Sequence, residues 1–175
     1  MSLTLYDAAI PLYVRMLKSL AAILDKGEAF AREKGMDPAS LTAARLAPDM
    51  APLTGQVQMA SDAAKGGAAR LAATEAPTME DTETTFAELK DRVARTIAYL
   101  ESVDREQVNS GEGRPIEMKF PGATMTFSAR DFLFQFSLPN FLFHVTTAYD
   151  VLRHKGVPLG KMDFLAGGAA PPAGT

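Results

Sequence analysis

The strongest repeating pattern in the chain is an apolar stripe within the first 35 residues. Apolar side chains recur there at spacings of three and four positions, which places them on one face of a helix. Thr4 followed by Asp7 offers a capping box at the start of this helix. We predict that the helix ends near Gly35. The stripe consists of Ile10, Tyr13, Leu17, Leu20 and Leu24.

A second helix is predicted to begin between residues 49 and 52 and to end near residue 73. Gly66 and Gly67 interrupt its middle, and each glycine costs up to roughly 1 kcal/mol in a helix interior. We therefore expect a bend or a close contact with another helix at this point. Its apolar side is formed by Leu53, Val57, Ala60, Ala64 and Leu71.

The third helix has a clear start signal, because Thr85 can act as its N-cap and Glu88 stands three positions later. An acidic, threonine-rich loop precedes it. The helix is predicted to extend to about residue 100. Its apolar stripe is Phe86, Leu89, Val93, Ile97 and Leu100.

The helical period then breaks, and apolar and polar residues alternate on either side of Pro121-Gly122. This alternation predicts a small β-hairpin over residues 116–127. An isolated hairpin is marginally stable, so we expect it to lie against the helices. The alternating apolar residues are Ile116, Met118, Phe120, Met125 and Phe127.

The last helix is predicted from Ser128 to about Lys155, with Gly156 as the residue that follows its end. Ser128 and Asp131 form another capping-box pattern. Pro139 lies inside this segment, and a proline there should kink the helix or divide it in two.

Four helices joined by short or moderate links predict an all-α fold, a four-helix bundle with a small β-hairpin before the last helix. One domain over residues 1–165 is expected, followed by a flexible tail over residues 166–175. The connector over residues 36–50 contains two prolines and is expected to hold one short helical turn at most.

The composition narrows the classes of function. The 175 residues include no cysteine, which excludes disulfides, thiolate catalysis and cysteine-bound zinc. The net charge of −3 gives no reason to expect nucleic-acid binding, which usually shows as a basic face. No stretch reaches the roughly 20 apolar residues of a membrane span, and the N-terminus lacks the basic region of a signal peptide. We therefore expect a cytoplasmic protein that binds neither nucleic acid nor membrane.

A polar stripe on the last helix is the main candidate for chemistry. Ser137, Asn140, His144 and Thr147 are spaced three, four and three positions apart and share one face of an otherwise apolar helix. Buried polar groups must be paired, so the stripe indicates either a hydrogen-bonded network or a site. His144 suits a metal ligand or an acid–base group. His154 lies about 15 Å further along the axis and cannot share a metal ion with it.

The second helix offers partners for this stripe. Asp49 and Gln56 are seven positions apart and would share a helix face. Gln56 could hydrogen-bond across the bundle to His144. Asp49 either caps the helix or contributes to the site. No phosphate loop, nucleophile elbow or HExxH helix is present.

Three segments resemble a bacterial and fungal domain family of unknown function that is grouped with the DinB/YfiT-like four-helix proteins. They are "ARLAPDMAPLTGQVQMASDAAK", "FAELKDRVARTIAYL" and "LPNFLFHVTTAYDVLRHKGVPLGKMDFL". The resemblance implies a four-helix bundle, a homodimer and a three-histidine site for a divalent metal such as Ni, Zn or Fe. Some members of the wider superfamily use such a metal to activate a small thiol.

His144 matches the second of two histidines that the superfamily places on its last helix. Asn140 stands where the first would be, and the second helix has no histidine. Two hypotheses follow. The protein is either a degenerate metal-dependent enzyme or a small-ligand-binding protein, with a polar cavity of His144, Asn140, Gln56, Asp49 and Thr147. Alternatively, it is a non-catalytic homodimeric interaction module that has lost the metal site.

Overall fold

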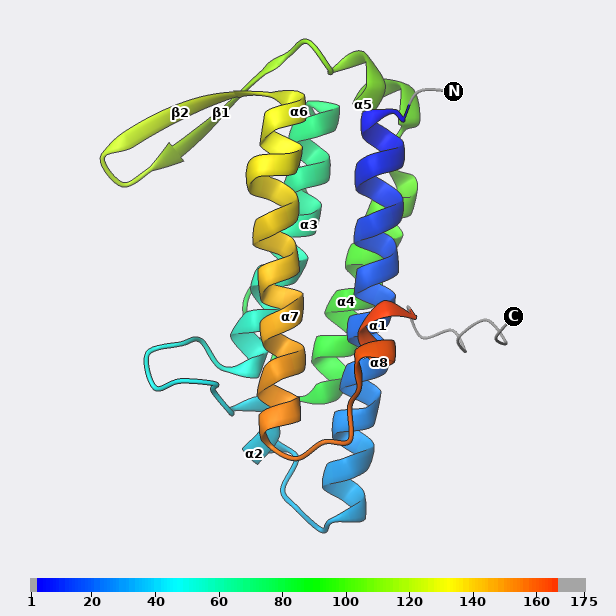
Figure 1. The fold of residues 1–175 in the computed structure, drawn as a ribbon, viewed down its shortest axis with the longest axis vertical. Helices are drawn as coiled ribbons and strands as arrows, with labels where there is room; N and C mark the ends of the chain where they lie inside the picture. The colour runs from blue at the N-terminus through cyan, green and yellow to red at the C-terminus, as the bar shows by residue number, and fades with distance from the viewer. Residues whose placement is uncertain (1–2, 167–175) are drawn as a thin grey trace.

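A computed structural model of the chain describes residues 3–166. Long helices lie side by side along one axis and form the predicted bundle, with the hairpin before the last helix (Figure 1). Shorter elements connect them or cover their ends. The long helices are α1 (Leu5–Glu33), α3 (Leu53–Ala72), α4 (Phe86–Ser102) and α7 (Leu138–His154). The short elements are α2 (Ala39–Thr42), α5 (Arg105–Ser110), β1 (Pro115–Phe120), β2 (Ala123–Ser128), α6 (Ala129–Asp131), the π-helical turn η1 (Phe132–Ser137) and α8 (Lys161–Leu165).

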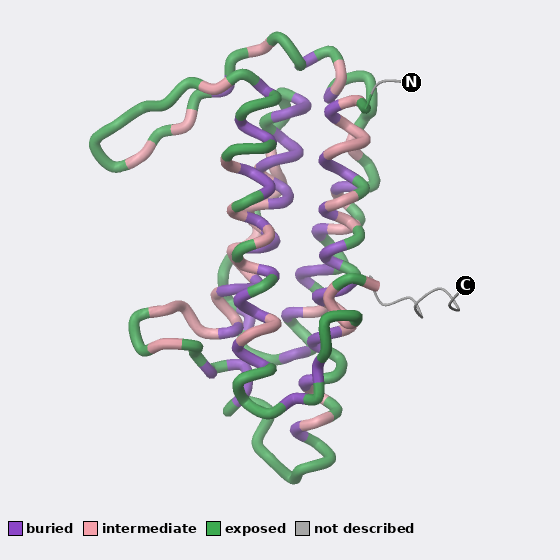
Figure 2. The backbone as a smooth tube through the Cα atoms, viewed as in Figure 1, coloured by how far each residue is buried: buried purple, intermediate pink, exposed green. Residues whose placement is uncertain are grey.

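The predicted stripes form the core. Buried positions follow the inward sides of the long helices, whereas the hairpin tip is exposed and the loop before α3 mixes exposed and intermediate positions (Figure 2). α3 packs against α7 and α4, and α1 packs against α4 and α7. Tyr13 of α1, Val57 of α3 and Val93 of α4 are fully buried. Each helix therefore buries the face that its sequence pattern indicates.

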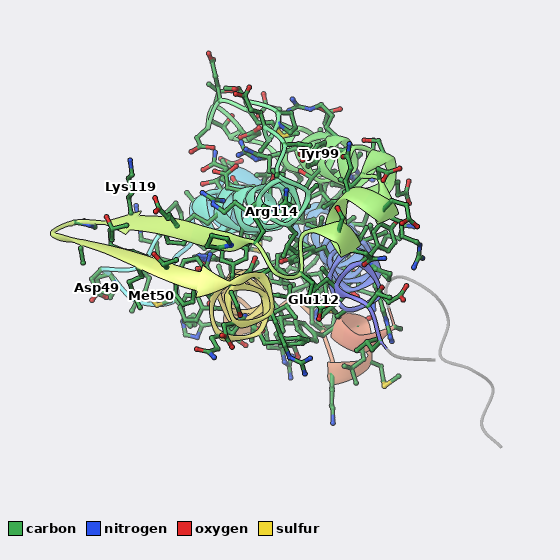
Figure 3. The ribbon with its side chains drawn as sticks, turned by 90° about the horizontal axis from the view of Figure 1, so that it is seen from above. Asp49, Met50, Tyr99, Glu112, Arg114 and Lys119 are labelled. Atoms are coloured by element: carbon green, nitrogen blue, oxygen red, sulfur yellow. The ribbon has the colours of Figure 1, made fainter. Side chains whose placement is uncertain are left out.

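Three of the predicted helix caps are confirmed, at Thr4, Thr85 and Ser128, and one is corrected. Thr4 accepts a hydrogen bond from the backbone N–H of Asp7, and Thr85 forms a capping box with Glu88. The N-cap of α3 is Pro52, so the prediction that Asp49 caps this helix is wrong. Asp49 lies on an exposed turn, on a loop that projects from the same side of the bundle as the hairpin (Figure 3). Pro48 and Pro52 flank this segment. They hold it outside the helix, because the residue before a proline disfavours the helical conformation.

The glycine pair in α3 marks a close contact and not a break, because α3 continues through it. A Cβ atom added at Gly67 would lie 2.7 Å from the Tyr13 Oη and closer still to the Ser137 Oγ. Only glycine lets α3 approach α1 and η1 this closely. The predicted close contact is confirmed, and it fixes the spacing of the helices where the polar side chains gather.

The hairpin has the predicted position and turn. β1 and β2 pair antiparallel about Pro121-Gly122, and Gly122 has a positive φ of 80°. Phe127 contacts the aromatic rings of Phe132 and Phe136 in η1. The base of the hairpin thus lies against the helices as expected, while its tip projects beyond them (Figure 1).

Pro139 does not separate the last helix into two. The chain instead forms the π-helical turn η1 just before α7, with Pro139 in the first turn of α7. A wider turn accommodates the missing N–H and the steric bulk of proline.

α5 and α8 lie outside the predicted elements, and α2 is the short turn expected in the connector. No helix within residues 3–166 is long and apolar enough to cross a membrane. The predicted flexible tail, apart from Ala166, lies outside the described residues.

Candidate functional site

A cavity of about 340 Å³ lies between α3 and α7, with η1 and β1 at its upper end. We call it the α3/α7 cavity. Its apolar wall comes from Met59 and Ala63 of α3, Phe132 and Phe136 of η1, and Met118 of the hairpin. The volume falls in the range of small-molecule sites, which are mostly apolar with a few placed polar groups.

His144 lines this cavity and is held in one orientation by Gln56. The Gln56 Oε1 lies 2.9 Å from the His144 Nδ1, and the Gln56 Nε2 donates to the carbonyl of Ala51 at 3.2 Å. Because the amide nitrogen is engaged with Ala51, the amide oxygen faces the ring and the His144 Nδ1 must carry the proton. The Nε2 of neutral His144 is then the acceptor. The predicted hydrogen bond across the bundle is confirmed.

The charge state of His144 follows from its surroundings. The ring is half-buried, and this burial lowers its pKa from the ordinary value of 6.5. Removing the ring from water disfavours its charged form. His144 is therefore neutral at pH 7, with the Nε2 lone pair able to accept a proton or a hydrogen bond.

A pair of hydroxyl groups lies beside the apolar wall. The Tyr13 Oη and the Ser137 Oγ are 2.7 Å apart, and both side chains are buried. Burial raises the pKa of Tyr13 to about 12, although the hydrogen bond with Ser137 opposes the shift. The phenol therefore stays protonated. Ser137 ends the π-helical turn and lines the cavity, in keeping with the frequent occurrence of π-turns at functional sites.

An ionic network lies next to the cavity and is centred on Arg92 of α4, whose side chain is fully buried. Its guanidinium lies 2.8 Å from the Asp62 carboxylate, 2.9 Å from that of Asp81 and 3.0 Å from that of Glu83. Asp62 also binds Lys65 at 2.9 Å and lines the α3/α7 cavity. The network therefore ties the acidic loop before α4 to one wall of the cavity.

Glu83 stays ionised within this network. Burial raises its pKa, but hydrogen bonds from Gln58, the backbone and Arg92 outweigh burial and hold the pKa below the ordinary value. Gln58 donates to Glu83 at 3.0 Å. Hydrogen bonds to the charged form of a carboxylate favour that form.

Comparison with known proteins identifies the family. Residues 5–165 match the domain of unknown function DUF1993. The chain belongs to the DUF1993 family. It is also similar to the crystal structure of a DinB family member protein from Shewanella denitrificans, at 40% sequence identity and a TM-score of 0.85. That match covers 98% of this chain and 95% of the other. The expected DinB-like family and fold are thus confirmed. No curated protein is detectably similar.

The side chains of this DUF1993 protein do not fit the three-histidine metal centre that the resemblance implies. Within residues 3–166, no three His, Cys, Asp or Glu side chains are grouped so that they could hold a metal ion. Asn140 lines the cavity with His144, but an amide is a weak ligand for transition metals. The carboxylate that lines the cavity, on Asp62, is engaged by Arg92 and Lys65.

The structure brings together some of the predicted site residues and separates others. His144 and Asn140 line the α3/α7 cavity, and buried Gln56 orients the histidine. The prediction that Asp49 shares a helix face with Gln56 is wrong, because Asp49 precedes α3 on an exposed turn. Thr147 is buried away from the cavity lining, and its hydroxyl donates to the carbonyl of Phe143 at 2.7 Å.

Sequence reasoning missed Arg70, which lines the upper end of the cavity. A signal for it was present. Gln56, Met59, Ala63, Gly67 and Arg70 follow one another at spacings of three and four, so they share one face of α3. This mixed stripe lies beside the apolar stripe of α3, whose periodicity is the stronger signal.

The tautomer and pKa of His144 can be measured by ¹⁵N NMR of the imidazole rings. We expect a protonated Nδ1 and a pKa below 6.5, since burial disfavours the imidazolium. In Gln56→Glu the new carboxylate should accept the same Nδ1–H and raise the pKa of His144. The His154→Gln variant lacks the other histidine, so its spectrum assigns the NMR signals to the two rings. A protonated Nε2 in the wild type would contradict this orientation.

This lowered pKa also predicts how stability depends on pH. The folded state resists protonation of His144, whereas the unfolded chain binds the proton near its ordinary pKa. The free energy of unfolding should therefore fall as the pH drops below about 6.5 and level off below the folded-state pKa. Urea unfolding of the wild type and His144→Gln at matched pH values isolates this contribution.

Proposed function

We propose that this DinB-like protein binds a small organic molecule in the α3/α7 cavity, with the His144 Nε2 as the acceptor of a proton or hydrogen bond from that molecule. One observation carries the proposal: a neutral histidine, oriented by Gln56, lines a cavity of about 340 Å³. Convergence of an apolar pocket and an oriented titratable group is the usual mark of a binding site.

The chemistry available at His144 supports this role. With Nδ1–H held by Gln56 at 2.9 Å, the ring cannot turn without losing that bond, so Nε2 keeps a fixed direction. A bound hydroxyl, thiol or acidic C–H would find a base whose pKa lies below 6.5. Such a base removes a proton only from a group within hydrogen-bond distance. Binding is the function proposed, and the arrangement would also serve general-base catalysis.

The second candidate is an interaction module that has lost a metal site and acts as a homodimer. Within the described residues, no three His, Cys, Asp or Glu side chains are grouped so that they could hold a metal ion, and this supports a lost metal site. Phe143, next to His144 on α7, is 57% exposed, and exposed aromatic side chains are enriched at protein interfaces. The cavity beside His144 supports the first candidate instead, because a lost site would be expected to fill with side chains. The homodimer stays a prediction.

A fragment screen observed at the two histidine rings tests the binding proposal. Small molecules that combine an apolar ring or chain with a hydroxyl, thiol or amide should shift the His144 signals and leave those of exposed His154 unchanged. His144→Leu should weaken the binding of such molecules by up to about tenfold, the usual effect of losing one good hydrogen bond. Circular dichroism confirms that the variant is folded.

His154→Leu is the matched control, because it removes the other histidine from the exposed end of α7. It should bind the fragments as the wild type does. If no fragment shifts His144 at millimolar concentration, the binding proposal is wrong. A wild-type dimer that Phe143→Ser converts to a monomer, measured by light scattering, would then favour the interaction module.

A further inference from the structure

The upper end of the α3/α7 cavity holds a guanidinium without a carboxylate partner. Arg70 lines the cavity and folds back along α3, so that its Nη1 donates to the carbonyl of Gly66 at 2.9 Å. A Cβ atom at Gly66 would lie 2.8 Å from the same Nη1, so glycine leaves room for this position. Within residues 3–166, no carboxylate lies within ion-pair distance of Arg70. Most of its N–H donors can therefore reach a ligand.

Arg70 sets the charge at the upper end of the cavity. The one carboxylate that lines the cavity, on Asp62, already binds Arg92 at 2.8 Å and Lys65 at 2.9 Å. His144 is neutral because burial lowers its pKa. Within residues 3–166, Arg70 is therefore the one cationic side chain that lines the cavity and lacks a carboxylate partner, and an anion is its complementary partner.

The two polar ends of the cavity are far apart. The His144 ring is level with Gln56, and the Arg70 guanidinium is level with Gly66. These two positions on α3 differ by ten residues, which corresponds to about 15 Å along the helix axis. The wall between them is apolar and includes Met59, Ala63 and Phe136. A molecule that reaches both ends must have a long apolar body.

We propose that the α3/α7 cavity binds an elongated apolar monocarboxylate that carries a hydroxyl at its far end. This assignment rests on the binding function proposed above. Arg70 pairs with the carboxylate, the apolar chain lies against α3 and η1 beneath Met118, and the distal hydroxyl donates to the His144 Nε2. A guanidinium pairs with planar carboxylates through two parallel hydrogen bonds. A carboxylate is favoured over a phosphate dianion, because a single charge costs less to desolvate beside the apolar wall.

Calorimetric titration of the full chain tests the assignment with octanoate, octanol, octyl phosphate and ω-hydroxyoctanoate. Wild-type protein should bind octanoate up to about fivefold more tightly than octanol, as expected for one ion pair at an exposed arginine. Arg70→Gln should remove this preference, and Arg153→Gln, at an exposed arginine outside the cavity, should retain it. His144→Gln should weaken ω-hydroxyoctanoate binding and leave octanoate binding unchanged.

The outcomes separate this inference from the function on which it rests. Equal binding of octanol and octanoate overturns the carboxylate assignment, and so does octanoate binding that is unchanged in Arg70→Gln. If fragments still shift the His144 signals in that case, the proposed binding function stands. Tighter binding of octyl phosphate overturns the choice of headgroup. If none of the four probes binds, the assignment is also overturned. If, in addition, no fragment shifts the His144 signals, the proposed binding function is wrong as well.

Discussion

Arg92→Met should lower the free energy of unfolding by about 3–5 kcal/mol, because removing one partner of a buried ionic network leaves the others uncompensated. The Arg92 side chain is fully buried, and Glu83, one of its carboxylate partners, is 5% exposed. Methionine fills a similar volume but cannot donate to Asp62, Asp81 or Glu83. Urea denaturation, followed by circular dichroism, measures the change.

Arg95→Met is the matched control for this prediction. Arg95 lies one turn further along α4, 3.7 Å from the same Glu83, but its side chain is 50% exposed. An exposed ion pair contributes at most about 1 kcal/mol, so this variant should remain close to the wild type. Adding Glu83→Gln to Arg92→Met should recover part of the loss, since it removes a buried unpaired charge. If Arg92→Met and Arg95→Met lowered the free energy of unfolding equally, the burial of Arg92 would not explain the contribution of the network to stability.

Gly67→Ala should lower the free energy of unfolding by about 1–3 kcal/mol through overpacking. Its added methyl group would meet the Tyr13 Oη at 2.7 Å and the Ser137 Oγ at a shorter distance. Both hydroxyls are buried and hydrogen-bonded to each other, so neither can move away freely. α3 should shift away from η1, which would also move Ser137 at the cavity wall. Thermal and urea unfolding give the magnitude.

Gly66→Ala is the neighbouring control on the same helix. Its methyl group meets only the guanidinium of Arg70, at the end of a flexible side chain. Alanine favours the helix over glycine by up to about 1 kcal/mol, so this variant should be at least as stable as the wild type. Because it displaces Arg70, it should nevertheless bind octanoate more weakly. A loss of stability as large as that of Gly67→Ala would contradict the close approach at Gly67.

Much of the site was accessible from sequence because local patterns place polar residues on helix faces. His144 and Asn140 could be assigned to one face of α7, and the hydrogen bond between Gln56 and His144 follows from two polar residues on otherwise apolar faces of adjacent helices. Asp49 was misplaced because the start of α3 depends on how the loop before it packs, and Pro52 is the N-cap. Arg92 was missed because its burial depends on carboxylates from a loop and from another helix.

The sequence alone determined the four long helices, their buried faces, two of their caps and the hairpin, because helix period, capping and turn chemistry act between residues close in the chain. The tertiary structure decided whether the polar stripe meets a cavity or solid packing. That outcome depends on how closely Gly67 lets α3 approach η1, on the π-helical turn before Pro139, and on the fold of Arg70 over Gly66. These are contacts between surfaces, and a linear pattern does not specify the space left between them.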